Sequence, residues 1–213
     1  PIPRKIEAVV KEEMPKPKRT EIEFIEPPDR LIEMECSKLR RQARDGEITT
    51  VHLPENLKAI RRELFKNCDK LHEVHIPPSV ILIKAKAFEN CSSLTQIQIP
   101  PSVTTIQEGT FRGCSSLIGI TIPSSINVIE PETFSGCTSI EEMAIPSSIT
   151  AIKRGAFSGC TSLSQITIPI SVTEIESEIF SGCTSLKQIT IPASVASIGD
   201  NAFSGCSSLR EIT

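Results

Sequence analysis

Apolar residues recur along this chain with a period of 23 residues. The clearest sign is a column of phenylalanines, each followed three residues later by a cysteine. These phenylalanines are Phe65, Phe88, Phe111, Phe134, Phe157, Phe180 and Phe203. Self-similarity at a fixed spacing of this size is typical of solenoids, in which each repeat forms one coil and stacks on its neighbours. The sequence therefore predicts a stack of coils, and any function has to be sought on the surface of that stack.

Each repeat contains one segment with the alternation expected of a short strand. Leu186, Ile189 and Ile191 follow the spacing L-x-x-I-x-I, so the last two lie on one strand face with a polar residue facing outward between them. A proline follows each such segment and should end the strand, because it has no N–H to donate. We expect one parallel strand per coil, with Val172 and Ile175 and their equivalents pointing inward from the far side of the coil.

One position of the repeat is reserved for glycine or asparagine. Directly before the cysteine stand Gly113, Gly136, Gly159, Gly182 and Gly205. In two earlier repeats Asn67 and Asn90 take this place. Glycine and asparagine share a tolerance of positive φ. The position therefore predicts a left-handed turn that closes each coil.

The eight cysteines do not form a disulfide pattern. Seven of them occupy one repeated slot, where we expect buried, reduced thiols that pack as small apolar groups. One cysteine per repeat also lacks the clustered spacing of a zinc site. Cys36 stands outside this series. It is either reactive or part of the core on a helix.

The repeat resembles that of the BspA-like, or Treponema-type, leucine-rich repeat family. Residues 191–213 follow the pattern I-P-x-S-V-T-x-I-x-x-x-A-F-x-G-C-x-S-L-x-x-I-x almost throughout, and the resemblance covers about residues 47–213. It implies an α/β repeat fold, namely a leucine-rich-repeat solenoid with one short parallel strand per 23-residue coil. It also implies a role in adhesion or protein binding, on bacterial surfaces among other places, without specifying one function.

Residues 1–28 differ in character from the repeats. They contain six prolines and mixed charges, a composition that favours an extended chain rather than a packed core. We interpret them as a proline-rich N-terminal arm whose apolar anchors are Ile22, Phe24 and Ile25. The arm either is a disordered tail, or lies along the solenoid or inserts into a partner and orders on contact.

Residues 29–46 predict a helix that caps the first coil of a solenoid spanning residues 47–213. Asp29 is the expected N-cap and Gly46 the expected stop. The apolar face of this helix should carry Leu31, Met34, Leu39 and Ala43. A solenoid end exposes core residues unless an atypical unit covers it. The far end stops at Thr213 inside a strand, so we expect either a continuation of the native protein or assembly through this uncapped end.

Composition excludes several classes of function. The net charge of −3, the absence of tryptophan and tyrosine, and the lack of a basic stripe argue against nucleic acid as a partner. No run of 18 apolar residues is present, so we expect no membrane insertion. There is no signal segment, which slightly favours an intracellular protein. The chain lacks an initiator methionine, however, so a lost leader and a cell-surface location remain the alternative.

No catalytic constellation emerges from the sequence. The chain has no G-x-S-x-G, H-E-x-x-H, phosphate-binding loop or dinucleotide fingerprint. The repeated Ser-Gly-Cys triplet is a scaffold element, because no histidine lies in the same repeats to activate a nucleophile. We therefore expect neither enzymatic activity nor a cofactor.

The outward positions of the strands form the predicted binding surface, a concave sheet. The candidate partner-binding residues on it are His52, His72, Glu73, His75, Gln96, Gln98, Ile118, Glu141, Glu142, Lys187 and Arg210. Neighbouring parallel strands lie about 4.8 Å apart, so His52 and His75 could touch. This arrangement permits a metal site or a pH-dependent contact, and it is equally explained by solvated polar residues. Ile118 is the exposed apolar candidate, whereas Met143 occupies a buried slot.

Two functions follow from these observations. The first is a non-catalytic scaffold for protein–protein interaction, as a structural or assembly component of a larger complex that binds through the concave sheet and the arm. The second is a cell-surface adhesin that binds host or extracellular matrix proteins. A full-length gene with or without a leader would discriminate between them.

Overall fold

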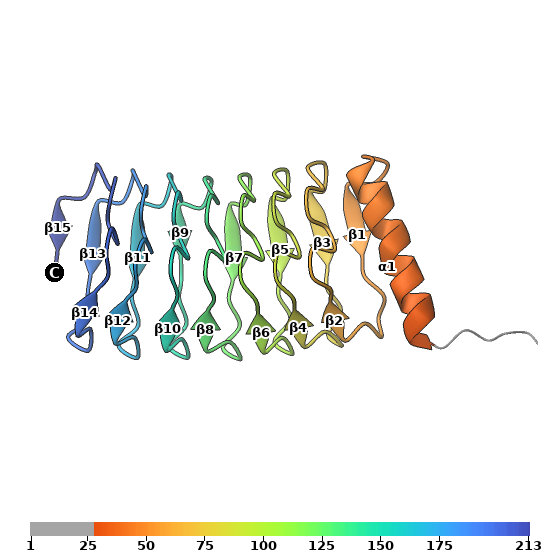
Figure 1. Cartoon of the computed structure of the whole chain (residues 1–213), viewed down its shortest axis with the longest axis horizontal. Coiled ribbons are helices and arrows are strands. Elements are labelled where there is room, and N and C mark those ends of the chain that lie inside the picture. Colours follow the sequence, from red (N-terminus) through yellow and green to blue (C-terminus); the bar gives the residue numbers. More distant parts are fainter. Residues whose placement is uncertain (1–27) are drawn as a thin grey trace, which may run out of the picture.

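The structure is a computed structural model, and it describes residues 28–213. A stack of similar coils follows a single helix, which lies against the first coil (Figure 1). In most coils the longer strand lies on one face, which we call the front sheet. The front strands are β1 (Thr50–His52), β3 (Glu73–His75), β5 (Gln96–Gln98), β7 (Gly119–Thr121), β9 (Glu142–Met143), β11 (Gln165–Thr167), β13 (Gln188–Thr190) and β15 (Glu211–Ile212).

A second, shorter strand lies on the opposite side of most coils. These back strands are β2 (Ala59–Ile60), β4 (Leu82–Ile83), β6 (Thr105–Ile106), β8 (Val128–Ile129), β10 (Ala151–Ile152), β12 (Glu174–Ile175) and β14 (Ser197–Ile198). The sequence predicted inward-pointing residues there but not the strands themselves. Two-residue strands leave no alternation to detect, because a period of two needs several residues to appear.

All pairing is parallel and joins positions one repeat apart. Val51 pairs with Val74, and Ile166 pairs with Ile189. The prediction of one parallel strand per coil on the front sheet is therefore confirmed. The hydrogen-bonded ladder is not continuous, however, since the front strands form two four-stranded sheets that meet between β7 and β9.

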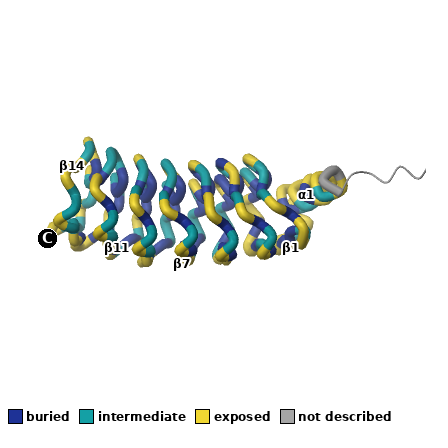
Figure 2. Tube along the Cα trace, turned by 90° about the horizontal axis from the view of Figure 1, so that it is seen from below, coloured by how far each residue is buried: buried dark blue, intermediate teal, exposed yellow. Residues whose placement is uncertain are grey.

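The core is a set of side-chain columns that run the length of the stack. Six phenylalanines of the column, from Phe65 to Phe180, are almost completely buried. Neighbouring rings in the column are stacked with centroids 5.6 to 5.8 Å apart. Figure 2 shows buried residues recurring at corresponding points of successive coils. Because each coil contacts only its neighbours, stability is distributed along the stack.

The left-handed turns lie where the sequence predicts them. Asn67 has φ 61° and Asn90 φ 59°, and the five glycines of the same slot have φ between 73° and 76°. A second left-handed position recurs earlier in the repeat and was missed. It is occupied by Glu63, Lys86, Gly109, Glu132, Gly155, Glu178 and Asn201. Its residue types differ so widely that no compositional signal marks it.

The helix α1 (Pro28–Arg44) packs on the first coil. Gly46 follows it with φ 77°, and the Gly46 and Glu47 N–H groups donate to the carbonyl oxygens of Ala43 and Gln42, as in a Schellman motif. The helix begins one residue before the expected cap, Asp29. Among residues 28–213 there is no helix with the length and hydrophobicity needed to span a bilayer.

The apolar face predicted for α1 is partly wrong. Leu31 and Met34 are 50% and 56% exposed. The side chains that contact the core are instead Ile32, Cys36, Leu39 and Ala43. These four follow the spacing i, i+4, i+7, i+11 of one helix face. Cys36 is therefore a core residue of the helix, which is the second of the two roles considered for it.

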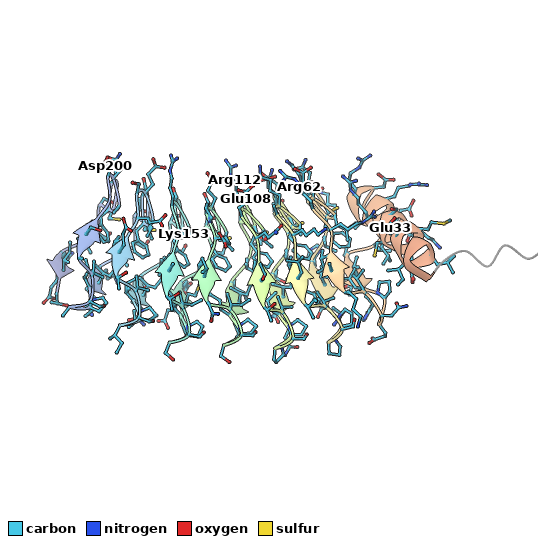
Figure 3. The ribbon with its side chains drawn as sticks, turned by 60° about the horizontal axis from the view of Figure 1, so that its bottom comes forward. Glu33, Arg62, Glu108, Arg112, Lys153 and Asp200 are labelled. Atoms are coloured by element: carbon cyan, nitrogen blue, oxygen red, sulfur yellow. The ribbon has the colours of Figure 1, made fainter. Side chains whose placement is uncertain are left out.

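Charged residues line the edge of the stack at the turns on either side of the phenylalanine column. Lys66 Nζ lies 2.7 Å from Glu89 Oε2, and Arg112 lies within 3.7 Å of both Glu89 and Glu132. These contacts link four coils in series. The hydrogen bond with Glu89 raises the pKa of Lys66. Figure 3 shows this charged edge, on which Arg62, Glu108 and Arg112 project outward.

Candidate protein-binding face

The front sheet places the predicted binding residues on one surface. Its three-residue strands bury the middle residue and expose the two flanking ones, except that the middle residue of β7 is only partly buried. On the strands themselves lie His52, Glu73, His75, Gln96, Gln98 and Glu142. Directly before a strand lie His72, Ile118, Glu141, Lys187 and Arg210. All eleven are exposed. Ile22, Phe24 and Ile25 of the arm lie outside the described residues.

The histidines form a stacked pair and a separate third residue. The rings of His52 and His75 are 4.1 Å apart and nearly parallel. His75 Nε2 lies 3.4 Å from Glu73 Oε1. His72 is held elsewhere, because its Nδ1 donates to the carbonyl oxygen of Lys70. In the described part of the chain no three histidine, cysteine or acidic side chains lie together as a metal site would require.

The middle of the front sheet is hollowed into a groove of about 1110 Å³. Strands β3, β5, β7 and β9 line it. Its apolar lining includes Ile118, Gly119, Ile120, Met143 and Ala144. Its polar lining includes Glu73, His75, Gln96, Gln98 and Glu142. Six of the eleven predicted binding residues therefore line the groove. The other five lie outside its lining: His52, His72, Glu141, Lys187 and Arg210.

The groove coincides with the interruption of the front ladder. β5 and β7 are paired from Gln96–Gly119 to Gln98–Thr121, and β9 pairs with β11. No backbone pairing joins β7 to β9 among the described residues. Gly119 faces open space, since a β-carbon built on it would have no atom within 4 Å. Sequence reasoning identified Ile118 but missed the groove, because the interruption occurs at only one coil.

The exposed side chains beyond the groove change in charge along the sheet. Glu142 accepts a hydrogen bond of 2.8 Å from the amide of Gln165. Lys187 and Arg210 follow on later coils, and their backbones are linked by a hydrogen bond from Arg210 N–H to the Lys187 carbonyl oxygen. The front sheet therefore presents Glu141 and Glu142 at its middle, whereas Lys187 and Arg210 lie near β13 and β15 together with the carboxylate of Glu211.

The repeated cysteines are structural groups. Every cysteine of the chain is a free thiol, and all but Cys206 are buried. Burial raises the pKa of Cys114 and of Cys160 to about 12. A thiol with so high a pKa carries almost no thiolate at neutral pH and is a poor nucleophile. The prediction of buried thiols holds for six of the seven cysteines of this column, and Cys206 in the last coil is only partly buried.

The comparisons with known proteins identify the family. A family model described as the BspA type leucine rich repeat region matches residues 43–162 and 127–213. The chain therefore belongs to the BspA-type leucine-rich repeat family, and the resemblance found in the sequence is confirmed. Proteins of this class are generally non-catalytic scaffolds for protein–protein interaction. No protein with a curated description is significantly similar to the chain.

Solved structures support the same assignment. A leucine-rich repeat protein from Bacteroides ovatus is 35% identical, with a TM-score of 0.74 over 77% of this chain and 45% of its own. A leucine-rich repeat protein from T. pallidum is 32% identical, with a TM-score of 0.72 over 76% of this chain and 78% of its own. One from Eubacterium ventriosum is 25% identical, with a TM-score of 0.67 over 76% and 44% of the two chains. This chain thus spans less than half the length of the first and third proteins.

Proposed function

We propose that this protein is a non-catalytic scaffold that binds a protein partner in the groove of the front sheet. The observation that carries the proposal is an exposed apolar lining inside a polar surface. Ile118 is 57% exposed at a position where the corresponding residues of other coils are polar or charged. An apolar centre with a polar rim is the usual anatomy of a protein–protein interface.

The groove also indicates the chemistry of the partner. Glu73 and Glu142 are part of its lining, and no lysine or arginine is. A complementary segment would insert an aliphatic or aromatic side chain over Ile118 and Gly119 and place basic residues beside the two carboxylates. The stacked pair of His52 and His75 extends this polar lining toward the first coil.

The proposal includes a structural or assembly role in a larger complex. The solenoid gives a long surface on which separate partners could bind at fixed spacing. The arm with Ile22, Phe24 and Ile25 would supply a second attachment, independent of the groove. Adhesion to extracellular matrix proteins is the alternative that the experiment below distinguishes.

The groove can be tested by filling it. Gly119→Arg places a long cationic side chain where there is open space, so the fold should tolerate it while the groove is blocked. Ile170→Arg is the matched control, because Ile170 is an 82% exposed apolar residue that does not line the groove. A third chain lacks residues 1–27. Each is used to capture proteins from the source cell and, separately, purified extracellular matrix proteins.

The proposal expects a specific cellular protein that the parent and the control capture and the Gly119→Arg variant loses. Equal capture by the parent, the Ile170→Arg control and the Gly119→Arg variant would overturn the role of the groove. Loss only on deletion of residues 1–27 would assign binding to the arm instead. Capture of matrix proteins alone, lost in Gly119→Arg, would replace the assembly role by adhesion.

A further inference from the structure

A second candidate site lies where α1 meets the first coil. Five arginines and one serine, together with Leu64, line an open pocket of about 500 Å³ there. The polar residues are Ser37, Arg40, Arg41, Arg44, Arg61 and Arg62. The first four belong to α1, and the last two follow the back strand β2. This pocket shares no residue with the groove of the front sheet.

The positive charge of the pocket is only partly neutralised. Its ion pairs are long and exposed, with 3.6 Å from Arg61 to Glu33, 3.8 Å from Arg62 to Glu63 and 3.9 Å from Arg44 to Asp45. Such pairs contribute little, at most about 1 kcal/mol each. Within residues 31–213, neither Arg40 nor Arg41 takes part in an ion pair. Five cationic groups from two elements therefore converge with only three carboxylates in long ion pairs to them.

Interaction with the dipole of α1 explains only some of these arginines. Arg41 and Arg44 lie in the last turn of α1, where cations interact favourably with the helix dipole. That effect does not extend to Arg61 and Arg62, which belong to another segment. Arg61 is moreover held in place, because its guanidinium donates to Ser37 Oγ at 3.2 Å and Ser37 in turn donates to the carbonyl oxygen of Glu33. Arg61 is therefore held in a fixed position among arginines whose positive charge is only partly neutralised.

We propose that this pocket binds an acidic segment of a protein partner, through carboxylates that several guanidinium groups share. Arginine matches the planar carboxylate through two parallel hydrogen bonds, which makes it the preferred residue for this recognition. Figure 3 shows Arg62 on a coil near α1, which carries Glu33. None of the residues that line the pocket belongs to a front strand.

Charge and shape favour a peptide over the other anionic partners. Single-stranded nucleic acid is bound by aromatic side chains on which bases stack, and no aromatic residue lines the pocket. A bilayer surface is flat, whereas these arginines line a concave pocket that individual acidic side chains can enter. The net charge of the chain is −3, so an acidic segment is not attracted by a general positive field of the protein.

The test uses a blocked hexaglutamate peptide with a fluorescent label, titrated with the full chain at low salt and followed by anisotropy. Arg40→Gln, Arg41→Gln and Arg62→Gln are combined in one variant, which spares the positioned Arg61. The matched control combines Lys58→Gln, Lys84→Gln and Arg154→Gln, which removes equal charge from exposed positions outside the pocket. Thermal melting verifies that both variants are folded.

The proposal expects saturable binding that weakens by about tenfold or more in the pocket variant and by less than about twofold in the control, since charge-assisted hydrogen bonds are lost only in the former. Absence of saturable binding overturns it, as does an equal loss in the control. Tighter binding of inorganic phosphate, a single-stranded oligonucleotide or phosphatidylserine vesicles would also overturn it, by assigning the pocket to another anion.

Discussion

The thiol of Cys137 donates a hydrogen bond to the carbonyl oxygen of Phe111, which belongs to the preceding coil, over 3.2 Å. The same contact recurs through the stack, from Cys91 with Phe65 to Cys206 with Phe180. Each of these carbonyl oxygens also accepts the N–H of the cysteine in its own coil, as Phe111 does from Cys114. The thiol therefore satisfies the second acceptor site of a buried carbonyl and links two coils.

Alkaline pH should destabilise the fold through these thiols. The unfolded chain releases their protons near pH 9.0, whereas burial raises the pKa of Cys114 and Cys160 to about 12 in the folded state. Their contribution to stability is complete below pH 9 and is lost as the pH rises toward 12. Each such thiol lowers the free energy of unfolding by about 1.4 kcal/mol per pH unit in this interval.

Urea unfolding at a series of pH values above 9 measures this loss. The double variant Cys114→Ala, Cys160→Ala is the control, because it lacks two of the titrating groups but keeps the lysines and arginines. Its unfolding free energy should fall less steeply with pH than that of the parent. Identical slopes would show that burial of these thiols does not shift their ionisation.

Thiol reagents should modify the cysteines of different coils at different rates. Cys206 is the one cysteine of the chain that is only partly buried, and the others are enclosed. We expect a chromogenic disulfide reagent at neutral pH to modify Cys206 first and the remaining thiols only as fast as the stack opens. Peptide mapping of the modified protein identifies the site, and Cys206→Ser should remove the fast phase. Rapid modification of several cysteines in the folded protein would contradict the buried column.

Truncation of a central ring should cost more than truncation of a terminal one. Phe134 is 1% exposed and stacks on Phe111 and Phe157, whereas Phe203 is partly exposed and stacks only on Phe180. Phe134→Ala should lower the free energy of unfolding by about 3 to 5 kcal/mol, because it leaves a cavity in a closed core. Phe203→Ala should cost clearly less in the same denaturation experiment. An equal loss of unfolding free energy in the two variants would mean that the number of stacked neighbours does not determine the contribution of a ring to stability.

The left-handed slot should accept asparagine and reject valine. Gly136 has φ 73°, and a β-carbon there would lie 3.6 Å from the backbone of Gly113, so space alone does not forbid a side chain. The penalty is conformational, about 1 to 2 kcal/mol for an ordinary residue and more for a β-branched one. Gly136→Asn should therefore melt close to the parent and Gly136→Val well below it. Similar melting temperatures for the two variants would rule out a conformational cause.

Repetition explains why much of this fold was predictable. The phenylalanine column, the front strands and the slot of Asn67 and Asn90 each occur many times, so accidental substitutions in one coil do not obscure the pattern. The face of α1 occurs once. Leu31 and Met34 were assigned to the core although Ile32 and Cys36 make the contacts. With a single helix there was no second copy against which to compare the register.

The candidate sites were predictable only in part, for the same reason. The pattern identified which residues face outward, and it placed His52 beside His75 correctly. The groove depends on the missing pairing between β7 and β9, which is a departure from the repeat. The arginine pocket depends on how α1 lies across the first coil, because Arg40 and Arg61 are far apart in sequence. Departures from periodicity, and contacts with non-repeated elements, leave no periodic signal.

The constant register between coils also bears on how such a chain can change in length. Strand pairing and thiol contacts join residues separated by a fixed interval, as in Gln165 with Gln188 and Cys160 with Phe134. Insertion or loss of one whole repeat would therefore leave every kind of contact intact. It would change only the separation between the arginine pocket at α1 and the groove at β7, by the width of one strand, about 4.8 Å. Recombination between repeats could thus alter the distance between the two proposed binding sites while leaving the residues of each site unchanged.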